Sequence, residues 1–537
     1  MLGRKKREKK LYYNVNIERK VPKNHILRKI EKLIDWDYIW QLAKEENRYS
    51  SIGQPSIDPT VHVKMLLIGY LYNIPSHRRI VEDCSLNIAY LWFLGYDIDE
   101  EIPDHSSISQ ARRRGHFTES FKNKVFIYIL GLCANAGLIS GEAVIDSTHI
   151  KAKASKDSTS TIVINPDFDG YFNQLDESLR IEDIEQPSED KEIPSLEAGD
   201  SNTKSKKKEK IKTVKIVDES LRSRELKYEC EKVNNETSRN DPECGILDRP
   251  GKPKGPHYLE HIVADANSGV ILGLRTTPGN TNDSAECLDT VDVTQQNLIE
   301  ANATMINKMG GDRGYDTVKV HIGLKIREIQ GYIAERKHKS TARGLSRERF
   351  IYDPNRDLFI CPNNKELIYK RTAKKREGVY QRVYNSFAKD CKHCKLKDKC
   401  LGNIKGKRKV LYRYVGIEAK EQAHEQNKVN RKEYRKMQRK RKTVIEGING
   451  EAKEQHGLDK AKMQGIEKVH EQAIFTAITI NIKRILKAKN SKPMQTAANA
   501  VKSKFHHNIR ILFLNIFASS INHNPVEKVS KQMKNRK

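Results

Sequence analysis

The sequence feature that most constrains the fold of this chain is a short apolar run that ends on one acid. Residues 143–145 are apolar and β-prone, and Asp146 follows them directly. Hydroxyl groups, His149 and two lysines, one of them Lys151, surround this carboxylate in the residues up to 154. An apolar β-prone run of this length is typical of a buried strand, and an acid placed at its end can bind a metal ion. The stretch therefore predicts a sheet that presents a metal-binding carboxylate.

Length and charge narrow the class of protein. A chain of 537 residues exceeds one ordinary hydrophobic core, so we expect two or three domains. Lys and Arg number 99 against 70 Asp and Glu, which gives a formal charge of +29 and favours nucleic acid as a partner. The basic N-terminus lacks the apolar core of a secretory signal, and the apolar stretches 125–139 and 511–521 are too short to span a bilayer. We expect a soluble intracellular protein that does not bind membranes.

The first part of the chain has the apolar spacing of helices. Residues 22–130 repeat apolar side chains at intervals near 3.6, and Pro59 suits the first turn of a helix. The segment 102–114 resembles the turn into the second helix of a DNA-binding helical pair. Three arginines of this segment would reach DNA phosphate: Arg112, Arg113 and Arg114. The alternative is an exposed basic helix in a purely structural bundle.

The middle of the chain changes character twice. Residues 167–200 carry twelve acids against two bases, and the stretch 204–212 is basic instead. We therefore predict that 156–255 is a charged, partly disordered insertion with a helix near 219–236. Two β-rich runs, 258–264 and 270–276, then flank a hairpin turn. A helix over 283–301, a strand over 304–309, a helix over 317–327 and a strand over 331–334 follow. This order places Asp146 and Asp312 at the ends of different strands.

A third acid follows a strongly basic segment. Residues 428–442 are basic and lead to Glu446, after which helical spacing continues to about 486. Two aspartates and a glutamate can hold two divalent cations, which activate water or a 3′-hydroxyl and stabilise the leaving oxygen during attack on phosphate. Mg²⁺ suits such a set, with Mn²⁺ able to substitute. Each acid taken alone is more often a cap or a turn residue.

The joint pattern resembles the insertion-sequence transposases of the DDE class. The resemblance is carried by 53–59, 74–79, 92–95 and 103–106 in the helical region, by Asp146-Ser147-Thr148, by 278–283, by Gly311-Asp312-Arg313-Gly314-Tyr315, and by Glu446 with Lys453. The family's signature has Tyr and Arg before its glutamate, and here those positions are Arg439 and Lys442. Glu451 on the same predicted helix is the fallback third acid.

The resemblance implies a fold and an activity. The fold is α/β: an RNase H-like mixed sheet flanked by helices, preceded by an all-α N-terminal domain and interrupted by insertions. Asp146, Asp312 and Glu446 would be the catalytic, Mg²⁺-binding residues. The partners would be double-stranded DNA, both terminal repeats and target, with a homodimer as the active form in the cytoplasm of a prokaryote, at the nucleoid. Beside the three arginines, the cations expected to contact DNA are Lys151, Arg441, Lys442 and Lys453.

Four of the nine cysteines cluster between the second and third acids. Cys361, Cys391, Cys394 and Cys400 include a Cys-x2-Cys pair, which is typical of structural zinc sites, with His393 as a substitute ligand. Free thiols are the alternative. The expected organisation is a helical DNA-binding domain at 1–135, core segments at 140–155 and 256–340, the charged insertion at 156–255, a Cys-containing insertion at 341–425, a core helix region at 426–490 and a basic tail at 491–537.

Two other functions fit the same residues. A nuclease on this fold would cleave DNA with divalent metal but would form no joined products. A non-catalytic DNA-binding protein derived from a transposase would bind terminal repeats with all three acids dispensable, and the presence of all three acids disfavours it.

Overall fold

The computed structural model describes residues 15–49, 55–155, 159–162, 235–249, 251, 254–336, 344–376, 379–402 and 408–490. Three segments lie outside these residues: the acidic stretch 167–200, the basic stretch 204–212 and the tail 491–537. The helix expected near 219–236 also lies outside them, except for its last residues. That end, at Asn235, begins a strand instead: β3 (Asn235–Ser238) pairs with β2 (Thr159–Ile162). Within the described ranges, no helix is long and apolar enough to cross a membrane.

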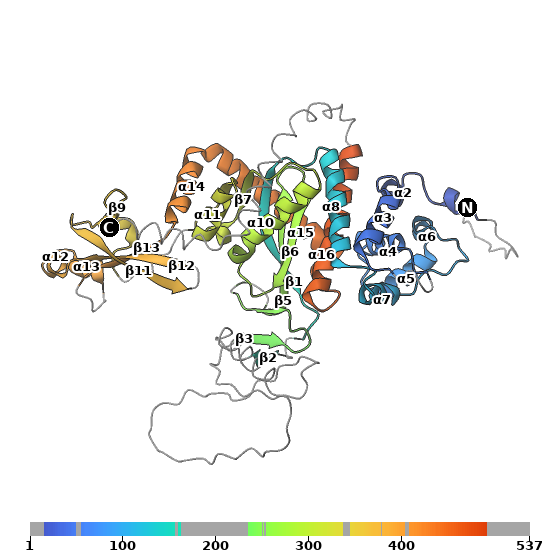
Figure 1. The fold of residues 1–537 in the computed structure, drawn as a ribbon, viewed down its shortest axis with the longest axis horizontal. Helices are drawn as coiled ribbons and strands as arrows, with labels where there is room; N and C mark the ends of the chain where they lie inside the picture. Colours follow the sequence, from blue (N-terminus) through green and yellow to red (C-terminus); the bar gives the residue numbers. More distant parts are fainter. Residues whose placement is uncertain are drawn as a thin grey trace, which may run out of the picture. The chain divides into compact units, whose positions relative to one another are not determined.

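The N-terminal region is helical, as its apolar spacing predicts (Figure 1). Asp58 caps the central helix α4, Pro59 occupies its first turn, and α4 is buried on every side from Pro59 to Tyr70. The helices are α1 (Ile17–Lys20), α2 (Ile26–Glu31), α3 (Trp36–Glu46), α4 (Pro59–Leu71), α5 (His77–Leu86), α6 (Ile88–Leu94), α7 (Ser107–Arg113) and α8 (Glu119–Asn135).

A mixed sheet follows, with β5 and β1 at its centre. Its strands are β1 (Glu142–Lys151), β4 (Gly245–Leu247), β5 (Gly255–Asp265), β6 (Ile271–Pro278), β7 (Lys308–Gly311) and β8 (Gln330–Ile333). The order runs β6-β5-β1-β7-β8, with β4 pairing with the start of β5. Strand β5 is antiparallel to β6 and β1, whereas β1, β7 and β8 are parallel. This order and these directions are those of an RNase H-like sheet, so the expected fold is confirmed.

Helices cover both faces of this sheet. They are α10 (Asp283–Glu300), α11 (Val318–Ile326), α14 (Ile417–Val429), α15 (Arg431–His456) and α16 (Ile466–Asn490), with a 3-10 turn η2 (Arg313–Tyr315) after β7. Successive side chains of a strand point to opposite faces. Because Asp146 contacts Arg441 of α15 and Ser147 contacts Asp283 of α10, these two helices lie on opposite faces.

A second sheet occupies the region between the second and third acids. It is antiparallel in the order β13-β12-β11-β10-β9, and the sequence predicted no sheet there. The elements are η3 (Arg347–Arg349), β9 (Ile351–Asp353), β10 (Leu358–Ile360), β11 (Glu366–Arg376), β12 (Val379–Ser386), α12 (Ala388–Lys392), α13 (Lys397–Leu401) and β13 (Val410–Tyr414). Its core is small: Phe350, Phe359, Leu367, Tyr384 and Leu411.

Candidate active site

Asp146 and Asp312 lie at the same level of two neighbouring parallel strands. In the β1–β7 ladder, Val144 is paired with Gly310. Each aspartate lies two residues beyond this pair, toward the carboxyl ends of the strands. Asp312 caps η2 and its carboxylate accepts a hydrogen bond of 2.7 Å from the Gly314 amide. The structure thus brings together two acids that are 166 residues apart in the sequence.

The electrostatics of Asp146 fit a cation-binding position. Burial raises the pKa of Asp146 to about 6, and the negative charges of Asp312 and Asp283 act in the same direction. The Ser147 amide and the Arg441 guanidinium oppose this rise, with Arg441 Nη1 at 3.5 Å from Asp146 Oδ2. Carboxylate oxygens crowded in this way are suitable ligands for Mg²⁺, whose charge would offset their repulsion.

Asp283 is a third acid at this end of the sheet, and no role was predicted for it. Its carboxylate accepts a 2.6 Å hydrogen bond from Ser147 Oγ and lies 3.4 Å from Arg249 Nη1. The turn motif 278–283 contains it, but an acid in the first turn of a helix is usually explained by the helix dipole. Only the hydrogen bond from Ser147 shows that Asp283 faces the residue after Asp146.

Gly314 and Tyr315 fill the space among these acids. A Cβ atom on Gly314 would lie 2.9 Å from Asp312 Oδ1, so a larger residue would displace that carboxylate, whereas its distance of 3.7 Å from Asp283 Oδ2 is an ordinary contact. Tyr315 is fully buried, and its hydroxyl has no hydrogen-bond partner among the described residues. Burial raises the pKa of Tyr315 well above its ordinary value, and Asp146 and Asp283 add to the rise, which places the hydroxyl near the acids.

Helix α15 packs against the sheet beside Asp146. A Cβ atom on Gly310 would lie 2.8 Å from Met437 Cγ, so glycine allows this close packing. Gln438 Nε2 donates hydrogen bonds of 3.1 Å to the Gly311 carbonyl and 2.6 Å to the Tyr332 carbonyl, which fixes the helix on β7 and β8. The residue that contacts Asp146 is Arg441.

Glu446 is on this helix but not on the face that contacts Asp146. Five residues separate it from Arg441, which turns it by roughly 140° around the helix axis. Its side chain is exposed, and the structure records no contact between it and either aspartate. The structure therefore brings the helix of the third acid to the site, while the Glu446 carboxylate faces solvent.

Two comparisons with known families agree with these observations. A model described as "Transposase domain (DUF772)" matches residues 15–114, and one described as "Transposase DDE domain" matches residues 360–486. The resemblance to insertion-sequence DDE transposases is confirmed. No protein in the curated collection matches the chain.

One solved structure with similarity to this chain is a piggyBac transposase synaptic complex with hairpin DNA. It is 9% identical and the match covers 93% of this chain and 84% of that chain, with a TM-score of 0.23. A score this low does not establish a shared fold. The fold assignment rests instead on the order and directions of the strands.

Glu451, the fallback third acid, is paired with two cations of α16. Lys483 Nζ and Arg484 Nη2 lie 2.6 and 2.7 Å from its carboxylate oxygens. Although burial raises its pKa, hydrogen bonds from His456 and these cations lower it far below the ordinary range. Glu451 therefore joins α15 to α16.

Arg112, which was expected to contact DNA, is paired with an acid of the protein in this structure. Its guanidinium forms a paired interaction with the buried Glu471 of α16, which Lys122 also contacts at 3.0 Å. Arg112 is therefore committed to holding helices together.

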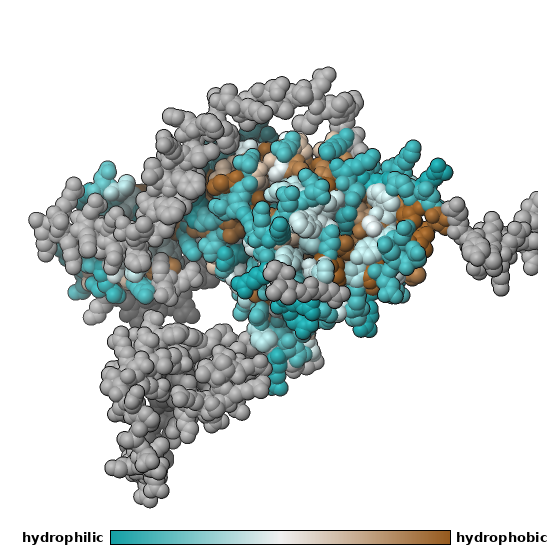
Figure 2. Space-filling model, turned by 45° about the vertical axis from the view of Figure 1, so that its right-hand side comes forward, coloured by the Kyte–Doolittle hydropathy of each residue, from teal (hydrophilic) through white to brown (hydrophobic). Residues whose placement is uncertain are grey.

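The other cations expected at DNA differ in exposure. Arg113, Arg114, Lys151 and Lys442 are exposed, Lys453 is partly buried, and Arg441 is directed at Asp146. Hydrophilic residues cover much of the visible described surface in Figure 2. Exposed cations on such a surface are available to phosphate.

The four clustered cysteines come together. Cys361 follows β10, Cys391 lies in α12, Cys394 follows that helix and Cys400 lies in α13. All four line one cavity of about 30 Å³. The alternative ligand His393 is the C-cap of α12.

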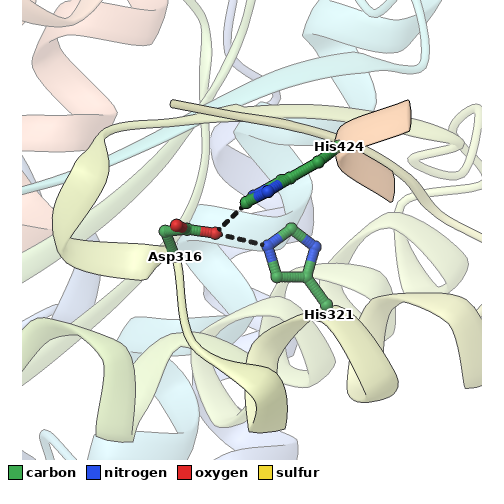
Figure 3. A group of neighbouring side chains, drawn as sticks. All are labelled: Asp316, His321 and His424. Atoms are coloured by element: carbon green, nitrogen blue, oxygen red, sulfur yellow. Dashed lines mark hydrogen bonds and ion pairs between the residues drawn. The ribbon is translucent and has the colours of Figure 1, made fainter. Parts of the chain in front are cut away.

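A second group with metal-ligand geometry lies beyond Asp312. Asp316 Oδ1 is 2.8 Å from both His321 Nε2 and His424 Nε2, so the carboxylate lies between the two rings (Figure 3). Lys420 Nζ is 2.8 Å from Asp316 Oδ2, which also accepts the Arg336 amide at 2.8 Å. Although burial raises its pKa, these donors lower the pKa of Asp316 below its ordinary range. The Lys420 ammonium already places a positive charge beside the Asp316 carboxylate. These ion pairs and hydrogen bonds therefore hold the loop after Asp312 against α14.

Proposed function

We propose that this transposase binds the ends of an insertion sequence, cleaves DNA there and transfers the cut strand to target DNA, with a divalent metal at Asp146 and Asp312. The observation that carries the proposal is the placement of these two aspartates side by side on β1 and after β7. The family matches and the +29 charge support DNA as the substrate.

The donor set fits Mg²⁺, with Mn²⁺ as a substitute. Asp146 and Asp312 would hold it, and Glu446 would complete the set. Of two cations held there, one would activate the attacking water or 3′-hydroxyl and the other would stabilise the leaving oxygen. Arg441 limits the repulsion between the acids and any phosphate that approaches Asp146, because its guanidinium lies 3.5 Å from that carboxylate. Gln438 holds α15 in register against the ends of β7 and β8.

Glu446 shares its side of α15 with three cations. Arg439, Lys442 and Lys453 stand seven and four residues before it and seven after it, and such spacings return to one face of a helix. DNA lying along this face would have its phosphates beside Glu446. For Glu446 to join Asp146 at a metal ion, this part of α15 must move when DNA and metal bind, because the Glu446 side chain is exposed here.

The proposed assembly follows from the chemistry. Both the terminal repeats and the target are double-stranded DNA, and two ends must be held together for transfer, so the active form is a homodimer. The proposed setting is the cytoplasm of a prokaryote, at the nucleoid.

A plasmid excision-and-integration assay on the native flanking DNA tests the three acids. Asp146→Ala, Asp312→Ala and Glu446→Ala should each reduce joined products by on the order of a thousandfold or more, as expected for residues that act as a unit. Glu454→Ala, which removes an exposed acid from the same helix, is the matched control and should retain activity.

Each rival function has its own outcome in this assay. Metal-dependent cleavage without joined products would identify a nuclease. Binding of the terminal repeats by wild type and by all three variants, without cleavage by wild type, would identify a non-catalytic DNA-binding protein. Retained activity in any one variant would remove that acid from the site.

A further inference from the structure

Four cysteines line one cavity at the second sheet. Cys361, Cys391, Cys394 and Cys400 come from three separate segments and line the same space of about 30 Å³. Each of the four is partly buried, whereas Cys84, Cys133, Cys244 and Cys287 are fully buried in other parts of the described chain. The clustering is therefore a property of this sheet rather than of cysteines throughout the molecule.

Polar groups around the sulfurs suit thiolates. The Lys365 amide donates a hydrogen bond to Cys361 Sγ at 3.3 Å, and Ser386 Oγ lies 3.1 Å from Cys391 Sγ. Lysine side chains Lys365, Lys397 and Lys409 are among the cavity residues. Four thiolates around one divalent cation carry a net charge of −2, which nearby lysines offset.

Apolar burial alone does little to hold this region together. Helices α12 and α13 have five residues each, and of these ten residues only Leu401 is buried. Cys361 and Cys400 pack against the small core of Phe350, Phe359, Leu367, Tyr384 and Leu411. Small cores of this kind are commonly completed by a disulfide or a structural metal.

We propose that Cys361, Cys391, Cys394 and Cys400 bind one Zn²⁺ ion that fixes α12 and α13 on the second sheet. Four thiolates in a Cys-x2-Cys arrangement with two further cysteines are the donor set of a closed, tetrahedral structural zinc site. The role is structural, since all four positions around the ion are taken by protein and none is left for substrate.

Zinc binding requires the sulfurs to move closer together. Among the described residues, the three ligand atoms that all lie within 4.8 Å of one another are those of Asp316, His321 and His424, not those of the cysteines. Sulfurs around zinc lie roughly 3.8 Å apart, from a Zn–S distance of about 2.3 Å and tetrahedral geometry. The two short helices are the segments that can move, because they are tied to the rest by so little buried surface.

Metal analysis of the purified full-length chain tests the proposal. We expect about one zinc per chain after growth with zinc, and Co²⁺ substitution should produce the thiolate-to-cobalt charge-transfer absorption of a tetrahedral sulfur site. The Cys391→Ser and Cys394→Ser double variant should lose the zinc. Cys84→Ala, a buried cysteine of α5, is the control that should keep it.

Two outcomes would overturn the proposal. One is folded wild-type protein that stays below about a fifth of an equivalent of zinc after reloading with Zn²⁺ under reducing conditions. The other is zinc that remains in the double variant. The cobalt spectrum is recorded on wild type, so a variant that fails to fold does not leave the question open.

Discussion

At the scale of single residues, Glu260 shows how burial changes chemistry away from the candidate site. It lies in β5 with no exposed surface, and Thr276 Oγ donates to its Oε2. Its other oxygen has no hydrogen-bond partner among the described residues. Burial raises the pKa of Glu260 from 4.5 to about 8, so the carboxyl is protonated in the folded protein at neutral pH.

The raised pKa of Glu260 predicts a loss of stability with rising pH. The folded state holds a proton that the unfolded state releases, so the contribution is complete below pH 4.5 and is lost as the pH approaches about 8. The slope is about 1.4 kcal/mol per pH unit between these limits. In Glu260→Gln this contribution should vanish. Urea unfolding of both proteins at about pH 5.5 and about pH 8, two values within that pH range, would show the difference.

Glu454→Gln on the exposed face of α15 is the control for that measurement, because an exposed acid keeps the wild-type pH dependence. Equal pH dependence in wild type and Glu260→Gln would show that the Glu260 carboxyl does not hold its proton.

At the scale of elements, one buried cluster of charges joins three helices. Glu471 of α16 accepts hydrogen bonds from Arg112 of α7 and Lys122 of α8, and the Glu471 side chain has no exposed surface. Charges buried in this way are stable only when they are paired. Arg112 thus has a structural task, whereas its neighbour Arg113 is exposed.

Substitution separates the two arginines. Arg112→Met leaves Glu471 with a single cation and should lower the free energy of unfolding by about 3–5 kcal/mol. Arg113→Ala should change stability by less than about 0.5 kcal/mol and should weaken DNA binding instead. Thermal unfolding and DNA titration at two salt concentrations measure both effects. Unchanged stability in Arg112→Met would contradict the structural role.

At the scale of the whole molecule, the N-terminal helices and the RNase H-like core share apolar contacts. The Phe475 ring of α16 stacks on Tyr70 of α4 at 5.9 Å and on Phe117 at 6.2 Å between centroids. The Nδ1 atom of His456 lies 2.6 Å from the backbone carbonyl oxygen of Tyr70. Phe475 and His456 follow Tyr70 and Phe117 by hundreds of residues in the sequence, yet in the structure all four belong to one packed region.

This shared packing predicts cooperative unfolding. All three tryptophans, Trp36, Trp40 and Trp92, lie in the N-terminal helices, so their fluorescence reports on that region. In wild type, the fluorescence and circular dichroism transitions in denaturant should coincide. Phe475→Ala should lower the unfolding free energy by about 3–5 kcal/mol in both signals. Phe387→Ala, which removes a ring that is 41% exposed, is the control and should cost far less.

Separate transitions in wild type, with only one of them shifted by Phe475→Ala, would show that the helical region and the core fold independently.

Local patterns determined most of the elements. The predicted segments 258–264, 270–276, 283–301, 317–327 and 331–334 correspond closely to β5, β6, α10, α11 and β8, because apolar periodicity and turn residues act over short distances. The strand expected at 304–309 differs: β7 begins at Lys308 and ends at Gly311. The continuous helical spacing expected up to about 486 is divided by a break between His456 and Ile466.

The sequence by itself determined that Asp312 directly follows a strand and that Glu446 stands on a basic helix. The expectation that Asp146 ends its strand is wrong, because β1 runs on beyond it to Lys151. Only the tertiary structure decided that the two aspartates are neighbours, that Asp283 joins them, that Arg112 is held by Glu471, and that Glu446 faces solvent. The physical reason is that strand pairing, burial and charge pairing depend on residues far apart in the chain. Those contacts form only when the sheet and its covering helices are packed together.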